Sequence, residues 1–342
     1  MPMTELRIGV IGSGFMGRTN AETISRYLKG ARLVAIAGGS RAAQLAADYG
    51  VECAPSVDAL LARPDIDAVF LSTPHSTHAA LATAAAARGK HVLVDKPMAA
   101  GVEECTRIID AAKQARVNLM VMFGQRFRKL NMEAYRLIQD GAIGRIQAIE
   151  SYALNTGGLA ALPAWQSRPE NLGTLFGHGV HNFDLVRWLT GDEISTVSAR
   201  VQREAASGNE VSTMAVLGLR SGAMATVWVS WSIPSPGIPA TTFSARVVGE
   251  KGILDLDPYA SLRLGRDGKW ETIATQAPID FLGKGMLDPV RLESYTAQGT
   301  EFLNSIREQR RPSVTGEDGR AAVAAALAAY QSSDERRTIV LD

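Results

Sequence analysis

Short apolar segments alternate with helix-forming segments through the first 123 residues. Their apolar residues follow one another continuously rather than at every second position, as expected for a parallel sheet covered on both faces. The apolar segments are Leu6–Ile11, Leu33–Ala37, Ala68–Ser72, His91–Val94 and Leu119–Met122. The segments between them favour helix and are Met16–Leu28, Ala42–Tyr49, Thr77–Arg88 and Val102–Ala115. The alternation predicts an α/β domain with a doubly wound parallel sheet over residues 1–123.

The pattern changes after Arg126, where strands begin to follow one another directly. Helices are expected at Asn131–Gln139, Val180–Leu189 and Asp318–Ser332. Strands are expected at Arg145–Leu154, Ile194–Gln202, Ser212–Leu219, Ala223–Ser230, Phe243–Gly249, Ser261–Leu264 and Thr338–Leu341. We therefore expect residues 124–342 to form an α+β domain on a large, mostly antiparallel open sheet. This domain would bind substrate and oligomerise, with its C-terminal helix able to pack back on the first domain.

Composition narrows the classes of partner. The 342 residues suit two domains, and 36 basic residues against 35 acidic ones give a net charge of +1. Nothing in this balance indicates a nucleic acid or membrane partner. No apolar run approaches the roughly 20 residues that span a bilayer, and no signal-peptide pattern is present. Cys53 and Cys105 form neither a disulfide framework nor a metal-like cluster, so we expect a cytoplasmic protein.

A glycine-rich turn joins the first predicted strand to the first predicted helix. It reads Gly12-Ser13-Gly14-Phe15-Met16-Gly17 and fits G-x-G-x-x-G. In a Rossmann fold the first glycine allows the tight turn, the second admits a pyrophosphate and the third permits close helix packing. A simple tight turn is the alternative. The strand–turn–helix context predicts a dinucleotide site that includes Gly12, Gly14, Phe15, Met16 and Gly17.

The end of the second predicted strand bears on the choice of cofactor. An NAD-preferring fold usually has an acidic residue there, to bind the ribose 2′-hydroxyl. Here the segment reads Ala37-Gly38-Gly39-Ser40-Arg41 and contains no acid. Ser40 and Arg41 offer a hydroxyl and a guanidinium to a 2′-phosphate, so we expect NADP, with NAD as the alternative. Ser40 could instead cap the following helix.

Two further motifs follow the third and fourth predicted strands. They are Thr73-Pro74-His75-Ser76-Thr77-His78 and Asp95-Lys96-Pro97. They resemble the Thr-Pro-x-x-x-His and Glu-Lys-Pro motifs of the glucose–fructose oxidoreductase / inositol dehydrogenase / MocA (Gfo/Idh/MocA) family of NAD(P)-dependent oxidoreductases. The resemblance extends over essentially the whole chain. It implies a cofactor site that also includes Thr73, Pro74, His75, His78, Asp95 and Lys96.

A third family motif, Asp-x-x-x-His, is altered in this chain. Gly177-His178-Gly179-Val180-His181 has Gly177 in place of the aspartate and keeps the histidine as His181. The resemblance implies that Lys96 and His181 are catalytic, while the loss of the aspartate leaves the proton relay open. His178 could supply some of the polar contacts that the family aspartate makes. Asp184 could orient the His181 imidazole, but we expect it to pair with Arg187 one turn on.

Candidate substrate residues come early in the second domain. Arg126, Arg128, Trp165 and Arg168, together with His178, could bind hydroxyl or carboxylate groups, although solvated arginines and a packing tryptophan are the alternative. The His75/His78 and His178/His181 pairs lack a cysteine or carboxylate cluster, so no metal is expected.

The combined interpretation is an NAD(P)-dependent oxidoreductase acting on a ring hydroxyl or ketone. The family resemblance implies a sugar or cyclic polyol as the substrate. Phe176–Asp184 also resembles members that act on aromatic cis-dihydrodiols, which adds cyclic diols. Hydride transfer is the chemistry that the cofactor supplies. A cofactor-binding regulator and a glycosidase using transient oxidation remain as alternatives. The open sheet predicts a homodimer or homotetramer.

Overall fold

The chain divides into two compact units, each with its own sheet and buried core. The structure is a computed structural model, and it describes residues 5–158, 173–205, 208–238, 243–280 and 283–341. One unit consists of residues 1–124 and 279–320, and the other of residues 125–278 and 321–342. Among the helices of these described ranges, none is long and apolar enough to cross a membrane.

The first unit is built on a six-stranded parallel sheet with the order β3-β2-β1-β4-β5-β6. Its strands are β1 (Leu6–Ile11), β2 (Ala31–Ala37), β3 (Glu52–Cys53), β4 (Ala68–Leu71), β5 (His91–Val94) and β6 (Leu119–Val121). Strand order reverses between β1 and β4, which makes the sheet doubly wound and opens a crevice at their carboxyl ends. The predicted fold class is confirmed, and β3 is a short strand that the apolar pattern did not predict.

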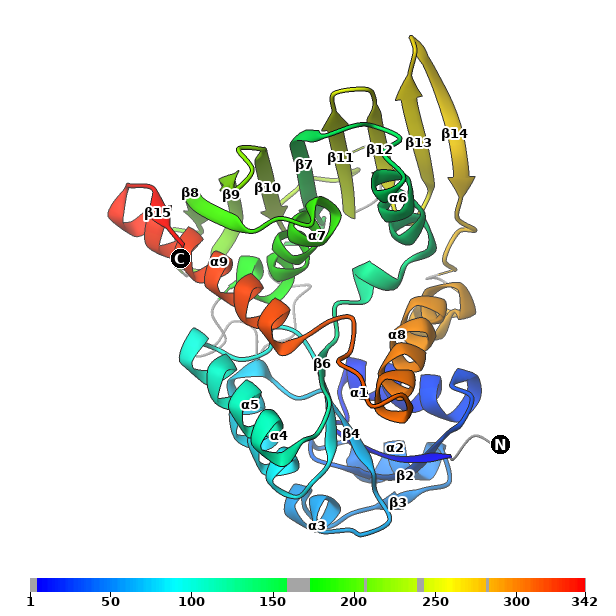
Figure 1. The fold of residues 1–342 in the computed structure, drawn as a ribbon. Coiled ribbons are helices and arrows are strands. Elements are labelled where there is room, and N and C mark those ends of the chain that lie inside the picture. The colour runs from blue at the N-terminus through cyan, green and yellow to red at the C-terminus, as the bar shows by residue number, and fades with distance from the viewer. Residues whose placement is uncertain (1–4, 159–172, 206–207, 239–242, 281–282, 342) are drawn as a thin grey trace. The chain divides into compact units, whose positions relative to one another are not determined.

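Helices complete this unit, and one of them comes from late in the chain. They are α1 (Phe15–Glu22, continued by the π-helical turn η1, Thr23–Tyr27), α2 (Ala42–Asp48), α3 (Val57–Leu61), η2 (His75–Thr77), α4 (His78–Ala87), α5 (Val102–Ala115), η8 (Gly285–Leu287) and α8 (Pro289–Arg307) (Figure 1). Sequence analysis did not predict α8, whose interior Gly299 weakens helix propensity. The missing side chain at Gly299 lets Leu28 pack against the helix.

The second unit is built on a nine-stranded sheet with the order β14-β13-β12-β11-β7-β10-β9-β8-β15. Its strands are β7 (Ile146–Leu154), β8 (Ile194–Arg203), β9 (Glu210–Leu219), β10 (Met224–Ser230), β11 (Phe243–Gly249), β12 (Ile253–Asp257), β13 (Ser261–Arg266), β14 (Lys269–Thr275) and β15 (Ile339–Val340). Among the described strands of this sheet, only β7 and β10 pair in parallel. The predicted large, mostly antiparallel sheet is confirmed, with β12 and β14 as additional strands.

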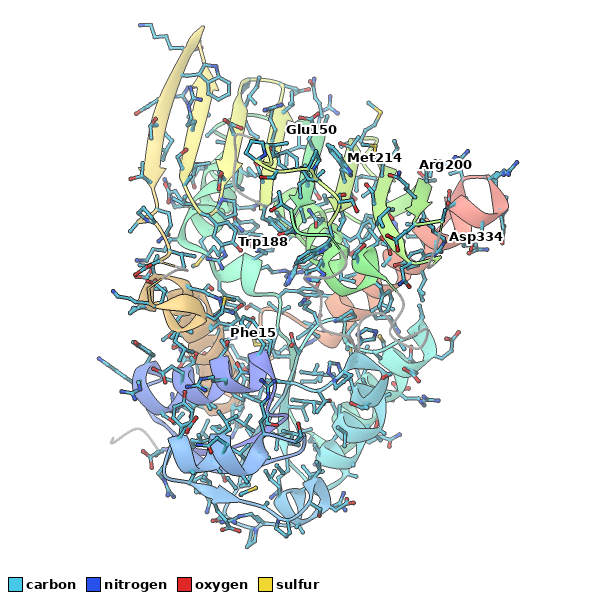
Figure 2. All side chains as sticks on the ribbon, turned by 180° about the vertical axis from the view of Figure 1, so that it is seen from behind. Phe15, Glu150, Trp188, Arg200, Met214 and Asp334 are labelled. Carbon is cyan, nitrogen blue, oxygen red and sulfur yellow. The ribbon has the colours of Figure 1, made fainter. Side chains whose placement is uncertain are left out.

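The described helices of this unit cover one face of the sheet, and none of them covers the other face. The helical elements are η3 (Gly124–Phe127), α6 (Lys129–Gln139), η7 (Leu175–Gly179), α7 (Val180–Thr190) and α9 (Gly316–Glu335), and α6 and α7 pack on the sheet (Figure 1). Side chains of β9 alternate between buried and exposed, so Met214 and Val216 lie on the open face. Figure 2 labels Met214 there with Glu150 and Arg200.

Strand register brings several functional segments to one edge of the sheet. Ser230 ends β10 beside Leu154, which ends β7, because the two strands run parallel. Phe243 begins β11 and pairs with Ala153, so it lies at the same edge. Ala245 pairs with Leu256, which places the end of β12 there as well. We call this the Phe243 edge.

Candidate active site

The glycine loop of the first unit has the geometry that a pyrophosphate site requires. Gly12 has φ +112°, and a Cβ there would overlap the carbonyl oxygen of Ser72. A Cβ on Gly17 would overlap the carbonyl oxygen of Gly12. Around Gly14, by contrast, the nearest atom is 3.9 Å from where a Cβ would be, so the backbone at the start of α1 stays open to a ligand. α1 has no acidic residue in its first turn to oppose an anion.

A cavity of about 360 Å³ adjoins this loop. Ser13, Phe15, Arg18 and Arg41 contribute to its lining. Arg41 is the N-cap residue of α2, and its backbone N–H donates to Ser13 Oγ at 3.2 Å. Its exposed guanidinium has no hydrogen bond or ion pair within the part of the chain that the structure describes. The arrangement suits a phosphate. The alternative that Ser40 caps α2 is wrong, because α2 has no side-chain cap.

The wall opposite α1 comes from the late segment of the chain, which sequence analysis missed. Met286 and Leu287 line the cavity, and Arg291 of α8 lies over the Phe15 ring at 4.8 Å. Arg291 Nη1 donates to the Met286 carbonyl at 2.6 Å and to Thr19 Oγ1 at 3.3 Å. The available signal was Asp288-Pro289, because the Asp288 carboxylate caps α8 and proline suits the first helical turn.

Asp95-Lys96-Pro97 follows β5 at the carboxyl edge of the six-stranded sheet. The backbone N–H of Lys96 donates to Asp95 Oδ1 at 2.8 Å, and the Lys96–Pro97 bond is cis. Burial raises the pKa of the Asp95 carboxyl, with Lys96 and His78 acting in the opposite direction. Burial lowers the pKa of the Lys96 ammonium, and Asp95 opposes this shift. Lys96 is therefore a partly buried amine beside a buried acid, which is an arrangement suited to proton chemistry.

His78 joins the two loops that carry the remaining first-unit motifs. Its ring nitrogens lie 2.8 Å from the Thr73 carbonyl and 2.9 Å from the Pro97 carbonyl, and 1% of the residue is exposed. Burial lowers the pKa of its imidazole. His75 is similarly buried, with 2% exposed. His78 thus holds the Thr73-Pro74 loop against the Lys96 loop.

In the second unit, both candidate histidines lie along the helix that meets the Phe243 edge. His178 belongs to η7, and its ring packs on Trp231 with centroids 5.0 Å apart. His181 belongs to α7 and contacts the Phe243 ring edge-on at 6.4 Å. Both rings are partly exposed, and Gly177 is buried. A π-helical turn such as η7 is frequent at functional sites.

A buried carboxylate anchors the start of this helix. Glu210 of β9 is 3% exposed and accepts from the backbone N–H of Leu175 at 2.9 Å and from Thr213 Oγ1 at 2.8 Å. The Tyr330 hydroxyl of α9 donates to Glu210 Oε2 at 2.6 Å and accepts from the N–H of Phe176 at 3.2 Å. Two backbone donors of the first turn are therefore satisfied from distant strands and helices. Sequence analysis identified neither residue.

Asp184 pairs with Arg126 rather than with Arg187, so the expected pairing was wrong. Arg126 Nε and Nη2 donate to the two Asp184 oxygens at 2.9 and 2.5 Å, and both residues are buried. Arg187 instead donates to Glu193 at 2.6 and 2.7 Å. The pair ties η3 to α7, the helix that carries His181, within the second unit.

Trp165 and Arg168 lie outside the described residues, so their role stays a prediction. Within the described ranges, no group of three histidine, cysteine or carboxylate residues could hold a metal ion.

Comparisons with known proteins agree with this organisation. Residues 6–123 match the model of an oxidoreductase family with an NAD-binding Rossmann fold, and residues 131–255 match the GFO/IDH/MocA C-terminal domain. Inositol 2-dehydrogenase 1 of Saccharopolyspora erythraea is 31% identical over 340 residues, which cover 96% of this chain and 94% of that protein. Myo-inositol 2-dehydrogenase of Thermotoga maritima is 26% identical over 98% of this chain and 99% of that protein. The crystal structure of aldose–aldose oxidoreductase from Caulobacter crescentus, complexed with glycerol, superposes with a TM-score of 0.84 at 26% identity, covering 98% of this chain and all (100%) of that one.

Replacement of Asp184 by asparagine should destabilise the protein strongly. The change removes the Asp184 carboxylate from the buried Arg126 guanidinium, and breaking a buried ion pair typically costs about 3–5 kcal/mol. The free energy of unfolding in urea, followed by circular dichroism, measures the loss.

Glu133→Gln is the matched control, because Glu133 makes the same two-bond pairing with Arg136 on the exposed face of α6. It should lose no more than about 1 kcal/mol. Similar losses in both variants would contradict the assigned role of the buried pair.

Proposed function

The chain belongs to the Gfo/Idh/MocA family of oxidoreductases, and from that premise we propose that it transfers a hydride between a nicotinamide cofactor and a ring carbon of a sugar, cyclic polyol or cyclic diol. The observation that carries the proposal is Lys96, a partly buried amine at the carboxyl end of β5 beside the buried Asp95. The relatives named as inositol dehydrogenases and as an aldose–aldose oxidoreductase support a polyhydroxylated ring as the substrate.

The residues of the first unit fit a dinucleotide. The open backbone at Gly14 and the start of α1 would hold the pyrophosphate, with Phe15 and Met16 beside it. Thr73, Pro74, His75, His78 and Asp95 would shape the nicotinamide end. Ser40 and the unpaired Arg41 guanidinium favour NADP over NAD, because a 2′-phosphate would match the charge. When bound, the nicotinamide supplies or accepts the hydride.

Side chains of the protein would accept and return the proton of the reaction. Oxidation of an alcohol releases a hydride from carbon and a proton from oxygen. We assign Lys96 to polarise the substrate oxygen and His181 to accept its proton in oxidation and to return it in reduction. His178, next to the altered position Gly177, supplies a further polar contact. Trp165 and Arg168 remain proposed substrate contacts, whereas Arg126 supports α7 through Asp184.

The open face of the nine-stranded sheet supports self-association. Met214, Val216 and Met224 are each more than half exposed, at 54%, 54% and 61%, and lie on adjacent strands. Apolar side chains gathered on one face are typical of an interface. We propose a homodimer or homotetramer formed through this face, and a cytoplasmic location.

Arg41→Ala should weaken NADPH binding by about 10- to 100-fold and leave NADH binding unchanged, because it removes the partner of the 2′-phosphate. Titration followed by nicotinamide fluorescence measures both constants. Arg32→Ala is the control, since Arg32 is an exposed arginine at the opposite end of β2. Tighter binding of NADH than NADPH by the wild type would contradict the NADP assignment.

Lys96→Met and His181→Asn should each lower kcat by about 100-fold or more while NADPH still binds, because each removes a group that acts on the substrate oxygen. Turnover of myo-inositol, scyllo-inositol, aldoses, cyclic diols, glucuronate and glucose 6-phosphate is followed by NADPH absorbance. Lys113→Met, at an exposed surface lysine, is the control.

A regulator would bind the cofactor and turn over none of these compounds. A glycosidase would release its product without net reduction of the cofactor. Either result would replace the dehydrogenase assignment.

Met214→Lys combined with Met224→Lys should dissociate the oligomer, because two charges would have to be buried in the proposed interface. Sedimentation velocity gives the mass of each species. Met132→Lys is the control, since Met132 is 49% exposed on α6, on the helix-covered side of the sheet. A monomeric wild type, or an unchanged mass in the double variant, would refute the interface.

A further inference from the structure

Arg128 is a buried cation whose charge no described residue matches. It lies between η3 and α6 and is 9% exposed. Its Nε is buried without a hydrogen-bond partner, and no side-chain hydrogen bond or ion pair joins Arg128 to the described part of the chain. Arg126, two residues earlier and 8% exposed, is fully paired by Asp184. Two arginines of equal burial in one segment therefore differ in whether the protein supplies their counter-charge.

The Arg128 guanidinium is held in a defined place. It lies over the Tyr259 ring, 4.1 Å from the centroid. Tyr259 is itself held, because its hydroxyl accepts from Gln125 Nε2 at 3.3 Å and its backbone N–H donates to Asp257 Oδ1 at 3.0 Å. Stacking covers one face of the guanidinium and offsets only part of its desolvation. It leaves the N–H fork at the edge of the group without an acceptor.

The start of α6 adds to this positive character. No side chain caps its N-terminus, and its first turn contains no acidic residue. The positive end of the helix dipole and the adjacent Arg128 charge therefore act in the same direction, and both favour an anion. The carboxylates of Glu133 and Asp140 on α6 are both bound to Arg136.

Arg128 belongs to the same edge of the sheet as the proposed catalytic histidine. Tyr259 comes two residues after the end of β12, and the end of β12 lies beside the start of β11. The start of β11 is Phe243, on which the His181 ring packs. A ligand that contacts His181 at the Phe243 edge would therefore also lie near the buried Arg128 guanidinium, which is held beside the end of β12, the strand next to β11.

We propose that Arg128 binds a carboxylate or phosphate group of the substrate, so that the enzyme acts on an acidic rather than a neutral sugar or cyclic polyol. The inference rests on the proposed function and specifies its substrate class. A planar fork of donors suits either anion. A neutral ring hydroxyl would leave the charge of Arg128 uncompensated.

The test compares glucuronate, glucose 6-phosphate and glucose, which share a ring and differ in charge. Binding to the NADPH-saturated protein is measured by isothermal titration calorimetry. Wild type should bind an anionic ligand at least about 10-fold more tightly than glucose. Arg128→Met, which retains an apolar side chain over Tyr259, should weaken anion binding by about 100-fold, and Arg128→Lys by less. The better of the two anions identifies the group.

Arg263→Met is the matched control, because Arg263 also stacks on an aromatic ring, that of Trp270, but on the exposed part of the sheet. It should bind all three ligands as wild type does. Melting temperatures establish that each variant is folded, and Arg128→Lys serves if Arg128→Met does not fold. A wild type that prefers neither anion to glucose would overturn the proposal, as would equal losses for charged and neutral ligands in Arg128→Met. Calorimetry needs no turnover, so absence of hydride transfer would refute the proposed function while leaving charge-dependent binding intact.

Discussion

Strand register in the nine-stranded sheet is the constraint on which the second unit depends. The parallel pairing of β7 with β10 and the antiparallel pairing of β7 with β11 end or begin these strands at one edge. A slip of one residue would turn every side chain of a strand to the other face. His181, His178 and Arg128 come from helical segments, yet each packs against a residue placed by this register.

Sequence analysis predicted well where one local pattern decides the structure. The segments Leu6–Ile11 and His91–Val94 have the same bounds as β1 and β5, because each contains an unbroken apolar run, Ile8–Ile11 or Val92–Val94, that is fully buried. The helix α8 was missed, since its amphipathic pattern is weak and its stability comes from packing on the first unit. Ion-pair partners could not be predicted either, because tertiary packing, rather than spacing along one helix, decides them. Spacing along α7 favoured Arg187 for Asp184, whereas the tertiary fold supplies Arg126.

The contacts at the start of η7 could not be predicted from residue spacing. Glu210 and Tyr330 come from β9 and α9, far along the chain, and meet at the backbone of Leu175 and Phe176. Gly177 removes the family carboxylate from this helix. Glu210 brings a carboxylate to the same turn, but its oxygens are engaged by a backbone amide and two hydroxyls. It therefore orients the helix.

The division of the chain between the units bears on how the protein is made. The chain passes from one unit to the other three times, after residues 124, 278 and 320. The cavity beside the glycine loop needs Met286 and Leu287 for its wall, and the Phe15 ring needs Arg291. During synthesis, the cavity beside the glycine loop can therefore form only after residues 286–291 have left the ribosome, when most of the chain has been made. A fragment ending near residue 124 would lack α8 and the part of the cavity wall that Met286 and Leu287 form. The first unit therefore cannot be produced in full from a continuous N-terminal segment.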